Sequence, residues 1–407
     1  MTRYACYIVT SFWAYGELHM ALDLAVRQRA AGIEPVFLIP PSHAELTRAK
    51  GIHYETLIPG SGKLNTMLLR DVQRRFRPGA VILADFLNFS FCERHYGLTL
   101  DDLDVFEAPV STFDIYDFGQ TSGRVDTYGF YARNMRGISV DRYHRLLQPS
   151  PIVPPDQPRN EQIIKYPLFE DLDRASDQAR ARARAELGFG ERDRVVLVTS
   201  AMWQKMHRSY DEVLPFIDAC KQALDEILAR VARDAVIVSV GASGVGESRE
   251  IPGLRQHGYL PAAEFDRIAA ACDLYVSNNY ISTSMGRLVL KGVPTLLIQN
   301  SISKHPDGGY VWFGREQTPL PPLLDQVARA YPFRMYPVGW HSFLRPVVAR
   351  NDFYRIMRHA ELFDVDGTVD LIETILSGGD ADRSELVLER YRAKIRKLPT
   401  AAEIGLP

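Results

Sequence analysis

The segment from His257 to Pro294 constrains the fold of this chain more than any other, because helix and strand signals alternate along it. Its first helix is predicted by apolar residues at helical spacing, namely Phe265, Ile268, Ala269 and Cys272. The run LYVS then indicates a buried strand, and a second helix is expected from about Ser282 to Lys291, ahead of the apolar strand TLLIQ. The Ser/Thr-rich start of this second helix would present unpaired backbone amides at the positive end of a helix dipole, which suits phosphate.

The first half of the chain shows the same alternation of strand and helix. Strands are predicted at YACYIVT, PVFLIP, AVILAD and PVSTFDIY and near residues 54–57, with helices near residues 18–31 and 66–76. Units of strand, helix and strand are right-handed and build parallel sheets. Residues 149–167 are dense in proline, which excludes a regular helix, so we predict an extended connector between two domains there.

The second half begins with an Arg/Ala-rich helix at residues 174–187. Its predicted strands are RVVLVTS, AVIVSVG, LYVSNN and TLLIQN, and its predicted helices lie near residues 211–232, 262–272 and 282–291. This alternation predicts a second Rossmann-like sheet, and beyond about residue 323 the chain is expected to be mostly helical. The expected domains are therefore residues 1–165, residues 166–383 and a C-terminal helix within residues 384–407.

Length and composition limit the classes of protein that this chain can belong to. A chain of 407 residues suits two domains, and a net charge of -2 offers no broad electrostatic surface for nucleic acid. The four cysteines are far apart in apolar contexts, so we expect a reducing compartment with neither a zinc site nor a disulfide framework. No basic leader and no apolar stretch near the roughly 20 residues that span a bilayer are found, which favours a cytoplasmic protein without a transmembrane segment.

Four motifs in the second half occur in a specific order and spacing: Gly258-Tyr259-Leu260-Pro261, Ala271-Cys272-Asp273-Leu274, Ser284 and Gly292-Val293-Pro294. Together they resemble the C-terminal half of GT-B glycosyltransferases, the nucleotide-sugar enzymes that include plant and antibiotic transferases and the peptidoglycan N-acetylglucosaminyl transferase. Two positions depart from that pattern. Asn279 stands where the family often has His, and Arg287 stands where it usually has a Glu that binds the donor ribose.

The resemblance implies an α/β fold of GT-B architecture, with two Rossmann-like domains whose parallel sheets face each other across a cleft. The N-terminal domain would bind the acceptor and the second domain the nucleotide sugar, while the helix within residues 384–407 would cross back to the N-terminal domain. These are expectations from the family.

At the first strand-to-helix turn, YGELHMALDLA resembles the family pattern Gly-His-x-x-Pro-x-x-x-Leu-Ala. The resemblance puts Glu17 at the position of the general base, with His19 two residues later as the other candidate. Asp114 would orient the base, and Asp85, at the end of AVILAD, is a candidate with less support. The alternative is structural: Glu17 complements the helix N-terminus, His19 makes an ordinary hydrogen bond, and the aspartates cap turns.

The resemblance also implies a set of donor-binding residues around the second sheet. They are Ser200, Met202, Lys205, Gly241, Tyr259, Leu260, Asn279, Ser282, Thr283, Ser284, Arg287 and Asp307. Helix-end hydroxyls and amides would hold the diphosphate, Lys205 would neutralise it, and Tyr259 with Leu260 would contact the base. Helix capping, a solvated basic turn and a Pro-Asp-Gly turn are the corresponding structural alternatives.

The function that the resemblance implies is glycosyl transfer from a nucleotide-diphosphate sugar, of uridine or thymidine, to a small-molecule acceptor, as in natural product biosynthesis. Displacement would be inverting and metal-independent, since neither Asp85 nor Asp114 has a second carboxylate at the Asp-x-Asp spacing, and the sugar nucleotide would be a co-substrate rather than a cofactor. The alternatives are a nucleotide-sugar 2-epimerase, or a noncatalytic module that binds a sugar nucleotide or a partner protein. No nucleic-acid partner is expected, and a homodimer is one admissible oligomeric state.

Overall fold

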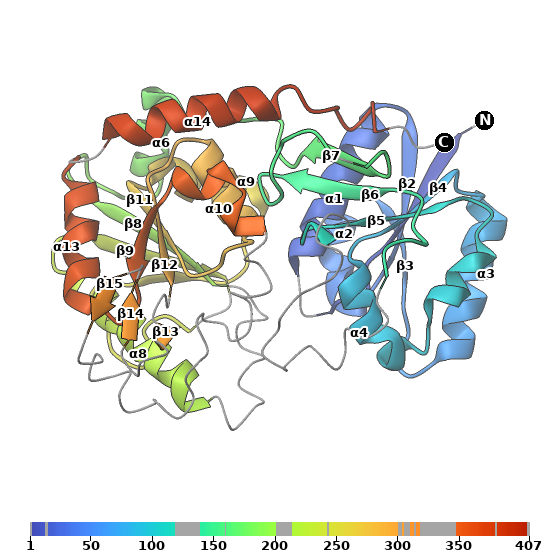
Figure 1. The fold of residues 1–407 in the computed structure, drawn as a ribbon, viewed down its shortest axis with the longest axis horizontal. Helices are drawn as coiled ribbons and strands as arrows, with labels where there is room; N and C mark the ends of the chain where they lie inside the picture. The colour runs from blue at the N-terminus through green and yellow to red at the C-terminus, as the bar shows by residue number, and fades with distance from the viewer. Residues whose placement is uncertain are drawn as a thin grey trace. The chain divides into compact units, whose positions relative to one another are not determined.

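The computed structural model describes residues 2–12, 15–118, 139–158, 160–200, 214–241, 244–299, 303–304, 310–312, 315–317, 347–378 and 381–404. The chain divides into two compact units (Figure 1). The first consists of residues Met1–Glu170 together with Ala393–Pro407, and the second consists of Asp171–Arg392. The C-terminal residues of the chain therefore belong to the same unit as its N-terminal half.

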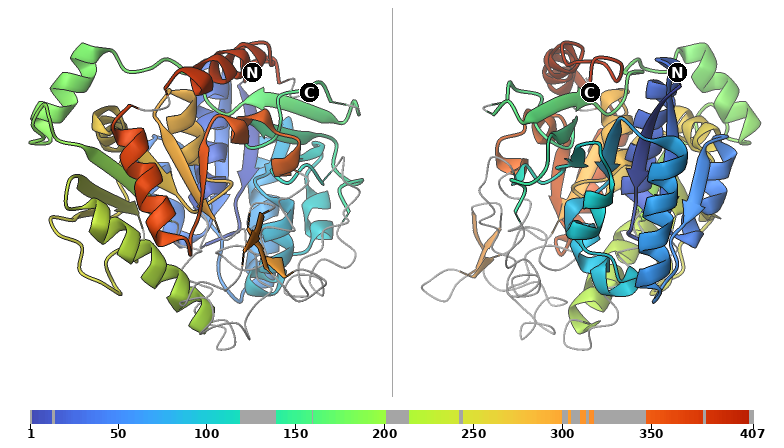
Figure 2. Two further views of the ribbon diagram at one scale, coloured as in Figure 1. Left: turned by 60° about the vertical axis from the view of Figure 1, so that its left-hand side comes forward. Right: turned by 90° about the vertical axis from the view of Figure 1, so that its right-hand side faces the viewer.

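The first unit contains a parallel sheet of seven strands in the order β3-β2-β1-β4-β5-β6-β7. The strands are β1 (Arg3–Ile8), β2 (Ile33–Ile39), β3 (His53–Thr56), β4 (Ala80–Leu83), β5 (Val110–Phe113), β6 (Leu146–Ser150) and β7 (Ile163–Pro167). The helices are α1 (Tyr15–Ala30), α2 (Ala44–Ala49), α3 (Gly62–Phe76) and α4 (Phe86–Tyr96), with the 3-10 turns η1 (Pro41–His43) and η2 (Leu100–Val105). Strands β1 and β4 are buried apolar runs, as expected when helices cover both faces of a parallel sheet (Figure 2).

The second unit contains a parallel sheet of six strands in the order β10-β9-β8-β11-β12-β16. The strands are β8 (Val195–Ser200), β9 (Val236–Gly241), β10 (Arg255–His257), β11 (Leu274–Ser277), β12 (Thr295–Gln299) and β16 (Arg358–Glu361). Its helices are α6 (Asp177–Glu186), α8 (Leu214–Val231), α9 (Ala262–Ala271), α10 (Thr283–Leu290), α13 (Val365–Leu376) and α14 (Ala381–Ile395), which continues into the first unit, with the 3-10 turn η5 (Asp352–Arg355). Short strands β13 (Ser303–Lys304), β14 (Tyr310–Trp312) and β15 (Arg315–Gln317) form a small antiparallel sheet.

Both sheets reverse their strand order beside their first strand, between β1 and β4 in the first unit and between β8 and β11 in the second. In open α/β sheets, ligands bind outside the carboxyl ends of the strands at such a reversal. The two parallel sheets confirm the predicted pair of Rossmann-like domains. They also locate the two places where function is expected, the loops after β1 and β4 and the loops after β8 and β11.

One prediction from local sequence signals was wrong. Residues 149–167 are not a connector, because β7 pairs with β6 from Ile163 to Pro167 and extends the first sheet. Pro167, the last residue of β7, is tolerated because β7 is the edge strand, where a missing N–H costs little. Beyond residue 323 the described elements are mostly helical, as expected, and strand β16 is the exception among them. Its sequence, RHAE, has no strand signal of its own, and pairing with β12 holds it in the sheet.

Asp273 ties helix α6 to the centre of the second sheet. Its carboxylate pairs with Arg180 at 2.5 Å and with Arg184 at 3.2 Å, and it accepts a hydrogen bond of 2.8 Å from the amide of Val195 at the start of β8. The Arg184 side chain is buried, so it relies on this carboxylate and on carbonyl oxygens for its polar partners. The hydrogen bond from Val195 to Asp273 thus fixes the register between β8 and β11, where the sheet reverses.

We predict that Asp273→Ala destabilises the second unit by about 3 kcal/mol, because a buried guanidinium loses its counter-ion. Urea denaturation monitored by circular dichroism measures this loss. Arg182→Ala is the matched control, since the Arg182–Glu186 pair lies on the exposed side of the same helix and should add little. Equal losses for the two variants would contradict the assignment.

Candidate functional site

Three carboxyl groups gather at the carboxyl edge of the first sheet. Glu17 lies in the first turn of α1, which follows β1, while Asp85 and Asp114 directly follow β4 and β5. Because these three strands are adjacent and parallel, their carboxyl ends meet at one edge. The residues are 8%, 4% and 0% exposed, respectively. Buried carboxyl groups at a sheet reversal are typical of functional sites rather than of a stabilising core.

Asn88 links two of these carboxyl groups. Its side-chain Nδ2 donates to Oε1 of Glu17 at 2.7 Å and to Oδ2 of Asp85 at 3.3 Å. Asp85 is the N-cap of α4 and accepts the amides of Leu87 and Asn88, while the hydroxyl of Tyr116 donates to its Oδ2 at 2.9 Å. The second oxygen of Glu17, Oε2, is buried and has no hydrogen-bond partner among the described residues. Glu17 therefore has one buried acceptor atom that no described group satisfies.

The two linked carboxyl groups differ in proton affinity. Burial raises the pKa of Glu17 to about 8, and the nearby charge of Asp85 adds to this rise. Burial also raises the pKa of Asp85, to about 6, but the hydrogen bonds from Asn88, Tyr116 and Leu87 stabilise its charged form. Asp85 therefore ionises first. At neutral pH the pair carries one charge on Asp85, and Glu17 is mainly protonated.

The structure separates the two candidates for the base. Glu17 is buried within the carboxyl network, whereas His19 is exposed on α1. The charge of His19 acts on His43, which is buried and contacts the carbonyl oxygen of Ser11; burial is the main reason why the pKa of His43 falls to about 4. The role of His19 as a base stays a prediction.

Asp114 is held by its surroundings. Its carboxylate accepts the amides of Tyr116 and Phe118 and the side-chain amide of Gln148. Its charge raises the pKa of Asp85, so it acts on the site electrostatically, whereas a role in orienting the base stays a prediction. Asp85, weighed with less support from sequence, is the carboxyl group linked to Glu17. Asn88 was missed, although an Asn at the third helical position after an Asp cap is a signal for such a network.

In the second unit, helix α10 begins at the sheet reversal as expected. Ser282 is its N-cap, and the Ser282 hydroxyl accepts the amide of Met285 at 3.2 Å. The carbonyl of Ser282 accepts the amide of Gly286. In the part of the chain that the structure describes, the amides of Thr283 and Ser284 make no hydrogen bond. Two donors thus remain unpaired at the positive end of the helix dipole.

A cluster of hydroxyl groups lies beside this helix start. The hydroxyl of Tyr275 on β11 is 2.5 Å from that of Thr199 on β8, and it also hydrogen-bonds to Ser277 and Ser282. Gly241, at the end of β9, has a φ of 112°, and a Cβ there would lie 2.2 Å from the carbonyl oxygen of Ser200. Only glycine fits so close an approach. The carboxyl ends of β8, β9 and β11 are therefore packed closely beneath the amides.

The structure gives the contacts or the exposure of several residues that were predicted to bind the donor. Arg287 pairs with Asp266 of α9 at 2.6 Å, and the two side chains are 29% and 33% exposed, so the guanidinium is already neutralised. Asn279 shapes its own loop, since its Oδ1 accepts the amide of Ile281. Tyr259 is 47% exposed and Leu260 is half-buried. Met202, Lys205 and Asp307 lie outside the described residues.

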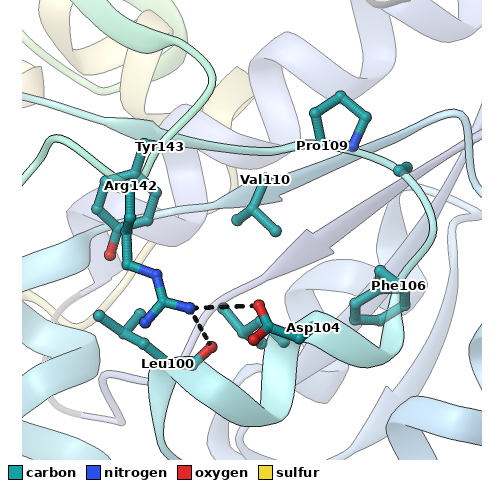
Figure 3. A pocket seen from close by; sticks show the side chains of 9 residues that line it. Leu100, Asp104, Phe106, Pro109, Val110, Arg142 and Tyr143 are labelled. Carbon is teal, nitrogen blue, oxygen red and sulfur yellow. Dashed lines mark hydrogen bonds and ion pairs between the residues drawn. The ribbon is translucent and has the colours of Figure 1, made fainter.

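A cavity of about 290 Å³ lies elsewhere in the first unit (Figure 3). It is lined by η2, by Pro109 and Val110 at the amino end of β5, and by Arg142, which pairs with Asp101 and Asp104. None of the residues predicted from sequence lines it. Because it lies at the amino end of β5, it is at the opposite edge of the sheet from Glu17 and is a separate feature.

Within the described ranges, no group of three or more His, Cys, Asp and Glu side chains is placed to hold a metal ion. No helix among them combines the length and the apolar character needed to cross a membrane. The four cysteines are buried and unpaired by disulfides, as expected.

Solved structures resemble this chain over nearly its whole length. The spinosyn forosaminyltransferase SpnP matches with a TM-score of 0.56 at 13% identity, covering 99% of this chain and 97% of its own. The Arabidopsis thaliana protein UGT89C1, solved in complex with quercetin, matches with a TM-score of 0.58 at 12% identity, covering 100% and 98%. The glycosyltransferase VinC, solved in complex with dTDP, matches with a TM-score of 0.53 at 14% identity, covering 98% and 97%. This likeness confirms the predicted GT-B fold.

Comparison of the sequence itself gives a different kind of result. No curated protein matches it. A family model matches residues 24–405, and its description is "Family of unknown function (DUF6365)". The chain therefore belongs to the DUF6365 family, a family of unknown function, and it has the GT-B fold of glycosyltransferases.

Proposed function

We propose that this protein is a glycosyltransferase that moves a sugar from a nucleoside diphosphate donor to a small-molecule acceptor. The observation that carries the proposal is the start of α10, at the reversal of the second sheet, where the amides of Thr283 and Ser284 have no hydrogen-bond partner among the described residues. A helix N-terminus with free amides binds phosphate through both hydrogen bonds and the helix dipole. The second unit is thereby the donor-binding unit.

Among the described residues, the groups at the helix start that can hold the diphosphate are neutral. Arg287, the cation nearest in sequence to the helix start, is occupied by Asp266. The amides and hydroxyls of Thr283 and Ser284 remain as donors to the phosphate oxygens. Such preorganised dipoles stabilise the charge that develops on a departing diphosphate without a metal ion, which is why metal-independent transfer is part of the proposal.

Fold relatives suggest which nucleotide to test first. VinC was solved with dTDP, and the spinosyn rhamnosyltransferase SpnG, with a TM-score of 0.50, was solved with thymidine diphosphate. Thymidine diphosphate is therefore the first donor base in the proposal, with uridine diphosphate second, and a role in natural product synthesis goes with it. Neither an epimerase nor a noncatalytic module is favoured by these comparisons. A cytoplasmic location and a homodimer stay predictions.

The first unit supplies the base. Oε2 of Glu17 takes the proton from the acceptor hydroxyl, and the electron pair of the broken O–H bond stays on the acceptor oxygen. That oxygen forms a bond to the anomeric carbon, while the bond from carbon to the diphosphate breaks and its electron pair leaves with the diphosphate. A single displacement of this kind inverts the anomeric centre. The negative charge of Asp85 makes Glu17 a stronger base, because it opposes ionisation of its neighbour.

We predict that Thr283→Pro weakens binding of thymidine diphosphate about tenfold, because one amide donor to a charged phosphate is lost. Proline is tolerated at this first helical position, since Ser282 before it has extended dihedral angles. Isothermal titration calorimetry measures the affinity. Thr283→Ala, which keeps the amide, is the control and should bind better than the proline variant. Wild-type protein that binds neither thymidine nor uridine diphosphate would contradict the proposed function.

We predict that Glu17→Gln lowers the transfer rate by about 10² to 10⁴, the usual contribution of a general base. In the wild-type enzyme kcat/KM should rise with pH toward about 8, because Glu17 must lose its proton. Product formation measured by chromatography between pH 5 and pH 9 tests both points. A wild-type profile that is flat across this range, or full activity in the variant, would exclude Glu17 as the base.

Because of Glu17, the stability of the folded protein should also depend on pH. The pKa of Glu17 is raised from 4.5 to about 8, so the folded state binds this proton more tightly than the unfolded state. The stabilising contribution of Glu17 is fully present below pH 4.5. It is lost as the pH rises through about 8, the pKa of Glu17 in the folded state. Glu17→Gln should therefore gain in Tm relative to wild type as the pH rises from 5 to 8. Glu34→Gln, at an exposed position of β2, should show a constant difference.

A further inference from the structure

The side chain of Asn88 is the only side chain in the described residues that contacts both Glu17 and Asp85 through hydrogen bonds. It is 9% exposed and comes from the first turn of α4, whose N-cap is Asp85 itself. The backbone amide of Asn88 donates to Oδ1 of Asp85 at 3.0 Å, while its side chain reaches Oδ2. Asp85 therefore holds Asn88 at both its backbone and its side chain, and the amide group has one orientation.

This orientation makes the two oxygens of Glu17 unequal. Oε1 accepts the Asn88 amide at 2.7 Å, whereas Oε2 has no hydrogen-bond partner in the described part of the chain. A neutral amide donor stabilises the ionised form of the carboxyl group that it contacts. Without Asn88, Oε1 of Glu17 would lose the side-chain donor that it shares with Asp85.

The other groups around Glu17 and Asp85 are carboxyl, hydroxyl and thiol groups, so the Asn88 amide is the group that links the two carboxyl groups. Asp85 caps α4, Cys92 lies within it, and Asp114 with Tyr116 follows β5. The charge of Asp85 also raises the pKa of Tyr143. Neither Glu17 nor Asp85 forms an ion pair with a described cationic side chain. Two buried carboxyl groups are thus held close together by an amide rather than by a positive charge.

We propose that Asn88 is the positioning residue of this site: it holds Oε1 of Glu17 beside the carboxylate of Asp85, so that Oε2 is the atom that takes the acceptor proton. The inference rests on the proposed function, because it assigns Glu17 its part in glycosyl transfer. Asn88 itself touches no reacting atom in this scheme. It acts through Glu17, on both the direction of Oε2 and the proton affinity of the pair.

The first test is Asn88→Ala. Loss of the amide should move the rise of kcat/KM to higher pH by about one unit, which corresponds to one hydrogen bond to a charged group. The rate at pH 7 should fall about tenfold, and the affinity for thymidine diphosphate should stay unchanged. A double-mutant cycle completes the test, because Glu17→Gln combined with Asn88→Ala should be no slower than Glu17→Gln alone.

Titration of the free protein tests the same inference without turnover. Carbon NMR of protein labelled at the Glu carboxyl carbon follows the Glu17 signal, assigned by its loss in Glu17→Gln. Asn88→Ala should raise its midpoint, and Asn88→Asp, nearly equal in shape, should raise it further by adding a carboxyl group. A shifted titration without glycosyl transfer by wild type would uphold the link between Asn88 and Glu17 and reject the proposed function.

Asn65→Ala is the matched control. Asn65 is also a buried amide of the first unit, and its side chain donates to the carbonyls of Ile58 and Tyr96. This variant should be less stable, but the titration midpoint of Glu17 and the pH profile of kcat/KM should be unchanged. If Asn88→Ala and Asn88→Asp also leave them in place, or if the rate losses add in the double variant, Asn88 has only a structural role and the inference is overturned.

Discussion

Parallel pairing of strands is the constraint on which the rest of this structure depends. When every strand in a sheet runs the same way, all the following loops and helix starts lie at one edge, and the reversal beside the first strand opens a place between them. In the first unit this brings the residues after β1, β4 and β5 together. In the second it brings the start of α10 beside the ends of β8 and β11. Residues far apart in sequence become neighbours for that reason alone.

The two edges use opposite electrostatics. The first gathers buried carboxyl groups, and their mutual repulsion and desolvation keep a proton on Glu17 at neutral pH. The second gathers amides and hydroxyl groups, and the cation nearest in sequence to the helix start, Arg287, is paired with Asp266. A proton-accepting group and an anion-binding group are the two parts that transfer from a diphosphate requires. The GT-B fold supplies a framework for both, but the fold alone does not specify a reaction.

Sequence reasoning succeeded where the signal was local. The start of α10 was readable from Ser282 and the Ser/Thr run. It failed where partners are distant. No sequence signal close to Arg287 indicates its pairing with Asp266. Likewise, the residues RHAE form β16 only because β12 lies beside them. Asp85 and Asn88 could be recognised as a cap, but their contact with Glu17, from the helix after another strand, follows only from the order of strands in the sheet.

The central claim is that the amide end of α10 holds a diphosphate, and a crystal structure of the protein with thymidine diphosphate tests it most directly. The account predicts phosphate oxygens within hydrogen-bond distance of the amide nitrogens of Thr283 and Ser284, with Arg287 still paired to Asp266. A nucleotide bound at another edge of the sheet, or a helix start whose amides are covered by the chain itself, would contradict it.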